Sequence, residues 1–126
     1  MSISRPDAFI AHVTSLPAVS IHEQWGSHVA KVGGKVFALV GAGPGEQPID
    51  FKVPETSFEI LTAEVGVDQA PYFAKRHWVR MAPGALDEAD LKAYIAQAHR
   101  MVAAALTRKS RAELGLDAYL ASGSTA

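Results

Sequence analysis

The chain has 126 residues, with 12 Lys and Arg against 13 Asp and Glu, no Cys, and 48% hydrophobic residues. This composition is typical of one small globular domain and excludes disulfides, thiolate metal sites and cysteine nucleophiles. The net charge of −1 is also untypical of nucleic-acid-binding proteins, which usually carry a basic excess.

Neither a membrane span nor a signal peptide is expected from the sequence. No apolar run approaches the roughly 20 residues that a transmembrane helix needs, and the first residues lack the apolar core of a signal peptide. We therefore expect a cytoplasmic protein, monomeric by default, that forms a single domain over residues 1–126. The small, polar residues 121–126 are expected to fray.

The first predicted element is a short helix. Pro6 suits its first turn, Ser4 is expected to cap its N-terminus, and the helix should end before Pro17. Its apolar face has helical spacing and consists of Phe9, Ile10, Val13 and Leu16.

Strands follow this helix. Two short runs rich in β-branched residues predict strands over 19–25 and 28–32. The Gly33-Gly34 pair separates the second run from a third over 35–40, and such a connection is a strong hairpin signal. We therefore expect an antiparallel meander in which both glycines adopt positive φ angles.

The chain then alternates between strand and helix patterns. Apolar and charged residues alternate over 49–53, which predicts another strand. Pro54 suits the start of a helix that Gly66 ends, and residues 77–81 predict a further short strand.

The last predicted helix has the clearest pattern. Asp87 is expected to cap it with Asp90 three residues on, and Arg108 and Lys109 are expected in its last turns. One face carries its apolar residues, namely Leu91, Tyr94, Ile95, Ala98, Met101, Val102, Ala105 and Leu106. A short helical turn over 112–120 is expected to follow.

Grouped strands with helices before and after predict an α+β fold. Its antiparallel β-sheet should be covered on one face by the two long helices. The opposite face would then be open, with Trp25 and Trp78 exposed on it. Such a face supports one hypothesis of function, a protein or small-ligand interaction domain.

The sequence contains no complete catalytic or metal site. The Gly-rich segment 41–45 lacks the Lys-Ser/Thr pair and the helix of a phosphate-binding loop, so a surface loop is expected. The five His, at positions 12, 22, 28, 77 and 99, lack helical zinc spacing and are expected to be solvated or hydrogen-bonded. With no nucleophile motif either, we expect no enzyme, no metal and no cofactor.

The segment 75–80 is the strongest candidate for a binding site. Three permanent cations and one imidazole surround Trp78 within six residues, Lys75-Arg76-His77-Trp78-Val79-Arg80. Cations beside an aromatic residue suit phosphate contacts next to a stacking surface. An ordinary edge strand protected by charge, with Trp78 in the core, explains the same pattern, and chemistry alone favours this second interpretation.

Four segments of the chain, in this order and spacing, resemble the MmcQ/YjbR family of small bacterial proteins. These segments are Val32 to Ala38, Pro71-Tyr72-Phe73, Lys75 to Val79, and Leu86-Asp87 leading into the last helix. The resemblance covers about residues 5–107 and leaves 108–126 as a C-terminal extension. It implies a frataxin-like (CyaY-like) α+β fold and a DNA-binding protein with a double-wing arrangement.

Carried onto this chain, the resemblance places the two wings at the hairpin tip and at the basic segment. The residues expected to contact DNA are Lys31, Gly33, Gly34, Lys35, Lys75, Arg76, His77, Trp78 and Arg80. The leading hypothesis is therefore a non-enzymatic DNA-binding module. Frataxin-like iron handling is not expected, because the first helix offers only Asp7. Near-neutral total charge predicts binding that is weak, salt-sensitive and confined to one face.

Overall fold

A computed structural model describes residues 2–122 as an α+β fold with a six-stranded antiparallel sheet. The sheet has the order β1-β2-β3-β4-β6-β5. Its strands are β1 (Val19–Gln24), β2 (Ser27–Val32), β3 (Lys35–Gly41), β4 (Ile49–Lys52), β5 (Val67–Gln69) and β6 (Trp78–Met81). The helices are α1 (Pro6–Val13), α2 (Glu55–Thr62), α3 (Glu88–Ala105), α4 (Arg108–Glu113) and α5 (Asp117–Ser122). The predicted fold class is confirmed.

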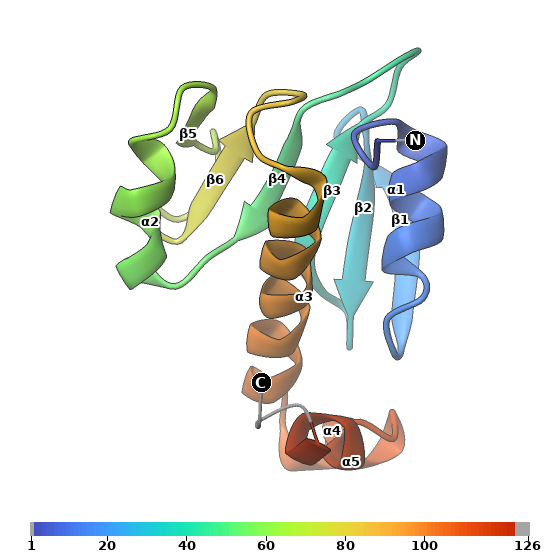
Figure 1. The fold of residues 1–126 in the computed structure, drawn as a ribbon. Helices are drawn as coiled ribbons and strands as arrows, with labels where there is room; N and C mark the ends of the chain where they lie inside the picture. The colour runs from blue at the N-terminus through green and yellow to red at the C-terminus, as the bar shows by residue number, and fades with distance from the viewer. Residues whose placement is uncertain (1, 123–126) are drawn as a thin grey trace.

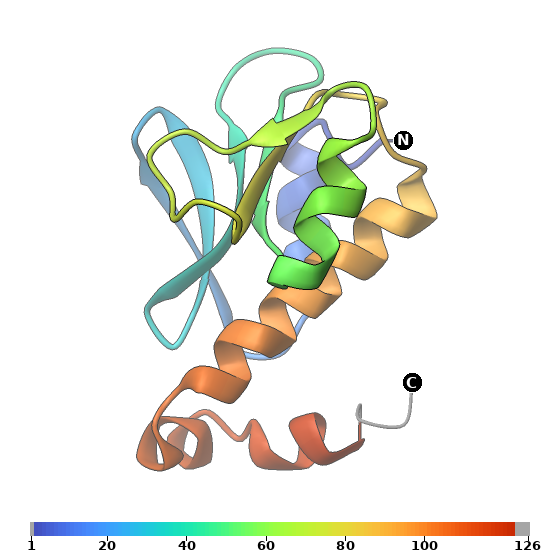
Figure 2. The same cartoon turned by 90° about the vertical axis from the view of Figure 1, so that its left-hand side faces the viewer.

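The sheet has one covered and one open face. Helices α1, α2 and α3 lie on the same side of it (Figure 1). Figure 2 shows the loop between β5 and β6 and the turn between β1 and β2 on the other side. Adjacent strands bring Val40, Ile49 and Met81 together beneath α3, where all three are fully buried. Burial of each such side chain contributes about 1.5–3 kcal/mol, so the covered face holds the core.

The hairpin between β2 and β3 forms as the Gly-Gly pair predicts. Gly33 and Gly34 have φ angles of 59° and 79°, in the region that glycine adopts without steric cost. A register shift between Ala30 and Lys31 adds one residue to β3. This bulge lets both Phe37 and Ala38 contribute to the core.

Helix ends differ from the predictions. The residue that caps α1 is Arg5, without a side-chain hydrogen bond, while Ser4 is buried. Asp87 occupies the N-cap of α3 but its side chain makes no capping bond. Extended backbone at Leu106 ends α3, and the Thr107 side chain accepts a hydrogen bond from the Ser110 N–H to begin α4.

Two helices, α4 and α5, stand where one short helical turn was predicted. Arg108 and Lys109 therefore lie in α4, and not in the last turns of α3 as predicted. Ala121 and Ser122 of the predicted frayed tail belong to α5, and residues 123–126 lie outside the described part of the chain.

The region around β5 also departs from prediction. Helix α2 begins after Pro54, which is its N-cap, and ends at Thr62 instead of continuing to Gly66. Strand β5 was not predicted, because three residues are too few to establish a period of two. Gly66, with a φ of 89°, turns the chain from α2 into this strand.

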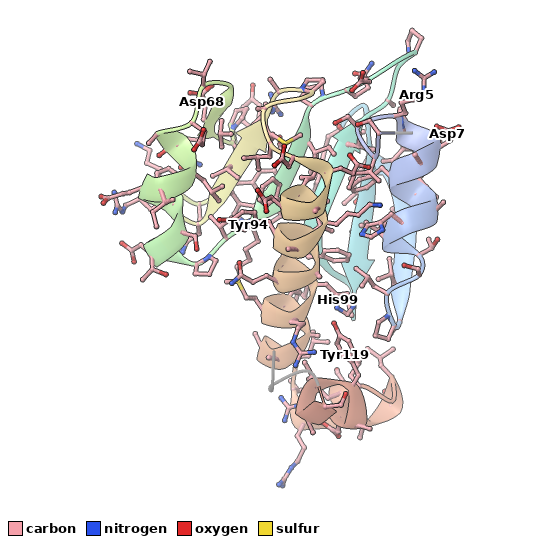
Figure 3. All side chains as sticks on the ribbon, viewed as in Figure 1. Arg5, Asp7, Asp68, Tyr94, His99 and Tyr119 are labelled. Atoms are coloured by element: carbon pink, nitrogen blue, oxygen red, sulfur yellow. The ribbon has the colours of Figure 1, made fainter. Side chains whose placement is uncertain are left out.

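A buried polar cluster attaches α5 to the rest of the fold. His99 of α3 lies beside Tyr119 of α5 (Figure 3), with 2.9 Å between His99 Nδ1 and the Tyr119 hydroxyl. His99 Nε2 lies 2.9 Å from the carbonyl oxygen of Pro17. Because a carbonyl oxygen only accepts hydrogen bonds, Nε2 carries the proton and Nδ1 accepts from the Tyr119 hydroxyl.

Within residues 2–122, no helix has the length and apolarity that a membrane span requires.

Candidate nucleic-acid interface

A hollow opens where β3 and β4 separate. These two strands pair only from Ala38 to Val40 of β3, so the start of β3 and the end of β4 diverge. The hollow has a volume of about 410 Å³ and lies between these strand ends and the connection from α3 to α4. Among the residues that line it are Lys35, Lys52, Thr107 and Ser110.

Two lysines, Lys35 and Lys52, line this hollow, and two more, Lys31 and Lys75, are neighbours of lining residues in the sheet or in the chain. We call these four residues the lysine end. Lys31 pairs in the sheet with Val36, which lines the hollow. Lys75 lies in the loop that enters β6 beside Trp78, the cross-strand partner of Lys52. Within the described part of the chain, none of the four forms an ion pair, and no Asp or Glu lines the hollow. Their positive charges are therefore not offset by direct partners.

Two hydroxyl groups also line the hollow, beside the apolar side chains of Trp78, Val102, Ala105 and Leu106. Thr107 Oγ1 accepts a hydrogen bond from the Ser110 N–H at 3.1 Å and donates one to Ser110 Oγ at 3.0 Å. The Ser110 hydroxyl keeps its own proton for a further acceptor. Ammonium and hydroxyl donors around one hollow are suited to phosphate oxygens.

Arg76 holds the loop between β5 and β6 against α2. Its Nε donates to Glu55 at 3.1 Å and its Nη2 donates to Glu59 at 2.9 Å. The guanidinium also lies over the ring of Phe58, 5.7 Å from the centroid. Hydrogen bonds to Glu59 and Glu55 raise the pKa of Arg76 above its usual value. Two carboxylates thus offset the charge of this predicted DNA-contacting residue.

Trp78 is buried, although it lies on the open face. Phe73 from the loop between β5 and β6 stacks on it with the ring centroids 4.0 Å apart and the planes 18° apart. Only 6% of Trp78 is exposed. Its indole is therefore covered and does not offer the exposed stacking surface that a base would need. We expected both Trp25 and Trp78 to be exposed on the open face, but only Trp25 is exposed.

Arg80 lies elsewhere on the open face and is bound to Asp50. Its Nε and Nη2 donate to the two carboxylate oxygens at 2.7 and 3.0 Å. Hydrogen bonding to Asp50 raises the pKa of Arg80, although partial burial opposes the shift. Arg80 is absent from the lining of the hollow beside the lysine end.

The remaining predicted residues are the two hairpin glycines and His77. Gly33 lines the hollow and, with Gly34, forms the hairpin tip between Lys31 and Lys35. His77 is exposed, and its carbonyl oxygen accepts a hydrogen bond from the Val53 N–H at 2.9 Å. Of the predicted residues, the structure thus brings Gly33, Lys35 and Trp78 together in the lining of the hollow, whereas Arg80 is outside it and Arg76 has acidic partners.

Sequence reasoning missed Lys52, Thr107 and Ser110. A signal for Lys52 existed in the alternating pattern of residues 49–53, which places Lys52 and Asp50 on the face opposite to Phe51. No comparable signal marked Thr107 and Ser110, because their contribution depends on where α3 ends.

The histidines are dispersed. His99 is enclosed as described above, and the His22 ring lies 2.9 Å from the Ser20 hydroxyl. His28 lies 3.7 Å from Glu23, and burial lowers the pKa of His12. Among residues 2–122 no three His, Asp or Glu side chains are grouped so as to hold a metal ion.

Two solved structures have a similar fold. A protein from Deinococcus radiodurans with a domain of the family DUF419 superposes with a TM-score of 0.78, at 22% identity and covering 88% of each chain. A protein from Pseudomonas syringae superposes with a TM-score of 0.65 at 18% identity, covering 76% of this chain and 97% of its own. At these identities the likeness concerns the fold alone.

The sequence comparisons define the family. No curated protein gives a significant match to the chain. The sequence profile of the YjbR family matches residues 14–101, which is more than half of the chain. The profile thus agrees with the resemblance seen in the hairpin and in the basic segment, and the chain belongs to the YjbR family.

Proposed function

We propose that this protein is a non-enzymatic DNA-binding module that contacts backbone phosphates through the lysine end. The single observation that carries the proposal is the hollow lined by Lys35 and Lys52 without an acidic residue among its lining. Lys31 pairs with Val36 of the lining, and Lys75 precedes Trp78 of the lining by three residues, in a chain with a net charge of −1. A balanced total charge is compatible with DNA binding when the cations are grouped in this way.

The proposal narrows the set of contacting residues predicted from the sequence. Phosphates are assigned to Lys31, Lys35, Lys52 and Lys75. Arg76 contributes less, because Glu55 and Glu59 offset its charge. Trp78 serves as a support for the loop and not as a stacking surface, because Phe73 covers it. Contacts between lysines and phosphates position a protein on DNA but do not recognise the base sequence.

The experiment is a salt titration of duplex binding, measured by fluorescence anisotropy of a labelled duplex. If four phosphates are neutralised, log K should fall with log salt with a slope of about −3.6. The double variant Lys35→Ala/Lys52→Ala should reduce the magnitude of that slope by about 1.8. Neither substitution removes a hydrogen bond or an ion pair found within residues 2–122, so the thermal unfolding of this variant should match that of the wild type.

Arg76→Ala is the matched control, because it also removes one positive charge near the same loop. It should change the slope less than Lys75→Ala does. A flat salt dependence would exclude phosphate binding at the lysine end. If Arg76→Ala loses as much affinity as Lys75→Ala while its thermal unfolding matches that of the wild type, Arg76 itself contacts phosphate, and the assignment of phosphates to the lysines alone is wrong.

A further inference from the structure

A second hollow lies on the open face and shares no lining residue with the hollow beside the lysine end. It has a volume of about 480 Å³, within the range of about 300–1,000 Å³ that small-molecule pockets occupy. Trp25, Tyr72 and Phe73 form its aromatic walls. The β1–β2 turn and the loop between β5 and β6, which carry these walls, project from the same side of the sheet (Figure 2).

The walls combine exposure with unusual backbone. Trp25 is 69% exposed and Tyr72 is fully exposed. Their φ angles are 55° and 69°, a region that Gly and Asn adopt easily and that aromatic residues rarely adopt. At Trp25 the two-residue turn between β1 and β2 requires this conformation, because Gln24 pairs with Ser27 and Gly26 also has a positive φ of 69°. Tyr72 belongs to no such hairpin turn, and a strained, fully exposed aromatic residue of this kind is characteristic of binding sites.

The base of the second hollow consists of Leu39, Asp50 and Arg80, which are cross-strand partners in three adjacent strands. The Asp50 side chain is 2% exposed, whereas the Arg80 side chain is 43% exposed. Both residues line the hollow, but a ligand there has access to much more of the Arg80 side chain than of the Asp50 side chain. Asp68, the partner of Arg80 on the other side, forms no ion pair with it within residues 2–122.

Arg80 retains unused donors. Its Nε and one N–H of Nη2 bind Asp50, so of its five N–H groups the two on Nη1 and one on Nη2 remain. Nη1 and Nη2 together form the edge of a guanidinium that binds a carboxylate through two parallel hydrogen bonds. The Ser27 hydroxyl, also in the lining, has no hydrogen-bond partner in the described residues and offers one more donor.

We propose that this second hollow binds a small, planar aromatic carboxylate, with its ring against the exposed side chains of Trp25 and Tyr72 and its carboxylate on the free edge of Arg80. Phe73 supports this wall, since its ring lies edge to face with that of Trp25 at a centroid distance of 6.5 Å. The aromatic walls favour a flat ring because offset-stacked and edge-to-face contacts are both accessible there. Asp50 keeps the guanidinium in place before the ligand arrives, which lowers the entropic cost of binding. The occupant is a free small molecule, because the hollow is small and open on one side.

The experiment follows the indole N–H signals of the full-length protein by NMR during a titration with 2-naphthoate. The Trp25 signal should shift saturably, with a Kd of about 1 mM or tighter for a ligand of this size. The neutral analogue 2-naphthamide and the non-planar cyclohexanecarboxylate should each bind at least about tenfold more weakly. Trp78 is covered by Phe73 and is an internal reference whose signal should move less.

Two variants remove the walls without threatening the fold. Trp25→Asn and Tyr72→Asn place Asn at positive φ, where it is favoured, so thermal stability should be unchanged or raised. Each variant should weaken 2-naphthoate binding by about tenfold or more. Val65→Asn is the matched control: Val65 is 94% exposed and is not part of the hollow, so its replacement should leave affinity unchanged.

Arg80→Lys tests the carboxylate-binding group. The substitution keeps a positive charge beside Asp50 but removes the guanidinium edge that would form two parallel hydrogen bonds with the ligand. It should weaken binding of 2-naphthoate and leave that of 2-naphthamide unaltered. The proposal is overturned if 2-naphthoate shows no saturable shift up to about 10 mM. It is equally overturned if the amide binds as tightly as the acid, or if Val65→Asn weakens binding as much as Trp25→Asn.

Discussion

Gly33 at the hairpin tip lies directly against Leu106, the residue that ends α3. A Cβ atom added at Gly33 would lie 2.5 Å from Leu106 Cδ1 and 2.8 Å from its Cδ2. At Gly34, by contrast, an added Cβ would meet no atom within 4 Å. Both glycines therefore provide the positive φ angles that the turn needs. Only Gly33 has a second role, because the absence of its side chain lets the hairpin approach Leu106 at the end of α3.

The consequence is a difference in stability between two alanine variants. Gly34→Ala should lower the free energy of unfolding by about 1–2 kcal/mol, the cost of a Cβ atom at positive φ. Gly33→Ala adds overpacking against Leu106 and should lower it by about 3 kcal/mol in total. Urea denaturation of the two variants measures this difference. Equal losses would mean that Leu106 moves aside freely.

The ion pair between Asp50 and Arg80 should respond unequally to loss of either partner. Arg80→Met leaves the buried Asp50 carboxylate without its partner and should lower the free energy of unfolding by about 3 kcal/mol. Asp50→Asn leaves a guanidinium that is 43% exposed and can bind water, so the loss should be about 1 kcal/mol. Chemical denaturation at constant pH and salt compares them, and the reverse order would contradict the burial of Asp50.

The stability of the fold should depend on pH through His99. Burial lowers the pKa of His99 below its ordinary value of 6.5, and the charge of Arg100 acts in the same direction. The unfolded chain therefore takes up this proton near pH 6.5 while the folded chain stays neutral. Stability should be full above pH 6.5 and fall below it, by at most about 1.4 kcal/mol per pH unit for one proton.

A His99→Gln variant tests this assignment. It should be less stable than the wild type at pH 8, because the bonds to Tyr119 and Pro17 are disturbed, but its stability should fall less between pH 6.5 and 5. Burial lowers the pKa of His12 too, so His12→Gln should flatten the remaining slope. Identical slopes in wild type and His99→Gln would show that this histidine does not govern acid sensitivity.

Phe73 should control the environment of Trp78. Phe73→Ala removes the ring that stacks on Trp78 at 4.0 Å and should expose the indole to water. In a Trp25→Phe background, where Trp78 is the sole tryptophan, the emission maximum should shift to longer wavelength. The free energy of unfolding should fall by about 1–2 kcal/mol. Unchanged emission would show that another part of the loop covers the indole.

Much of the local structure was determined by the sequence alone. Gly33 and Gly34 predicted the hairpin because the freedom to adopt positive φ without steric cost belongs to glycine itself, whatever surrounds it. The periodic apolar face of the last helix and the alternation in 49–53 likewise required only local information. The same motifs identified the family, and the lysines at the hairpin were predicted with them.

The helix ends and the shortest strand, β5, depend on tertiary contacts and not on the local sequence alone. Ser4 satisfies the sequence preference of a cap, yet it is buried and Arg5 is the N-cap. Leu106 continues the apolar periodicity of α3 but lies past its end, where it packs against the hairpin tip. Packing against distant segments overrides propensities that amount to only about 1 kcal/mol each.

The candidate site was decided by tertiary structure above all. Lys35 and Lys52 line one hollow because β3 and β4 diverge there, and the sequence cannot show where two strands stop pairing. The charges near Trp78 appeared as one basic segment, yet residues up to 30 positions away in the chain divide it by pairing with Arg76 and Arg80. A sequence fixes how many charges a segment carries, but only the fold determines which of them remain without a counter-ion.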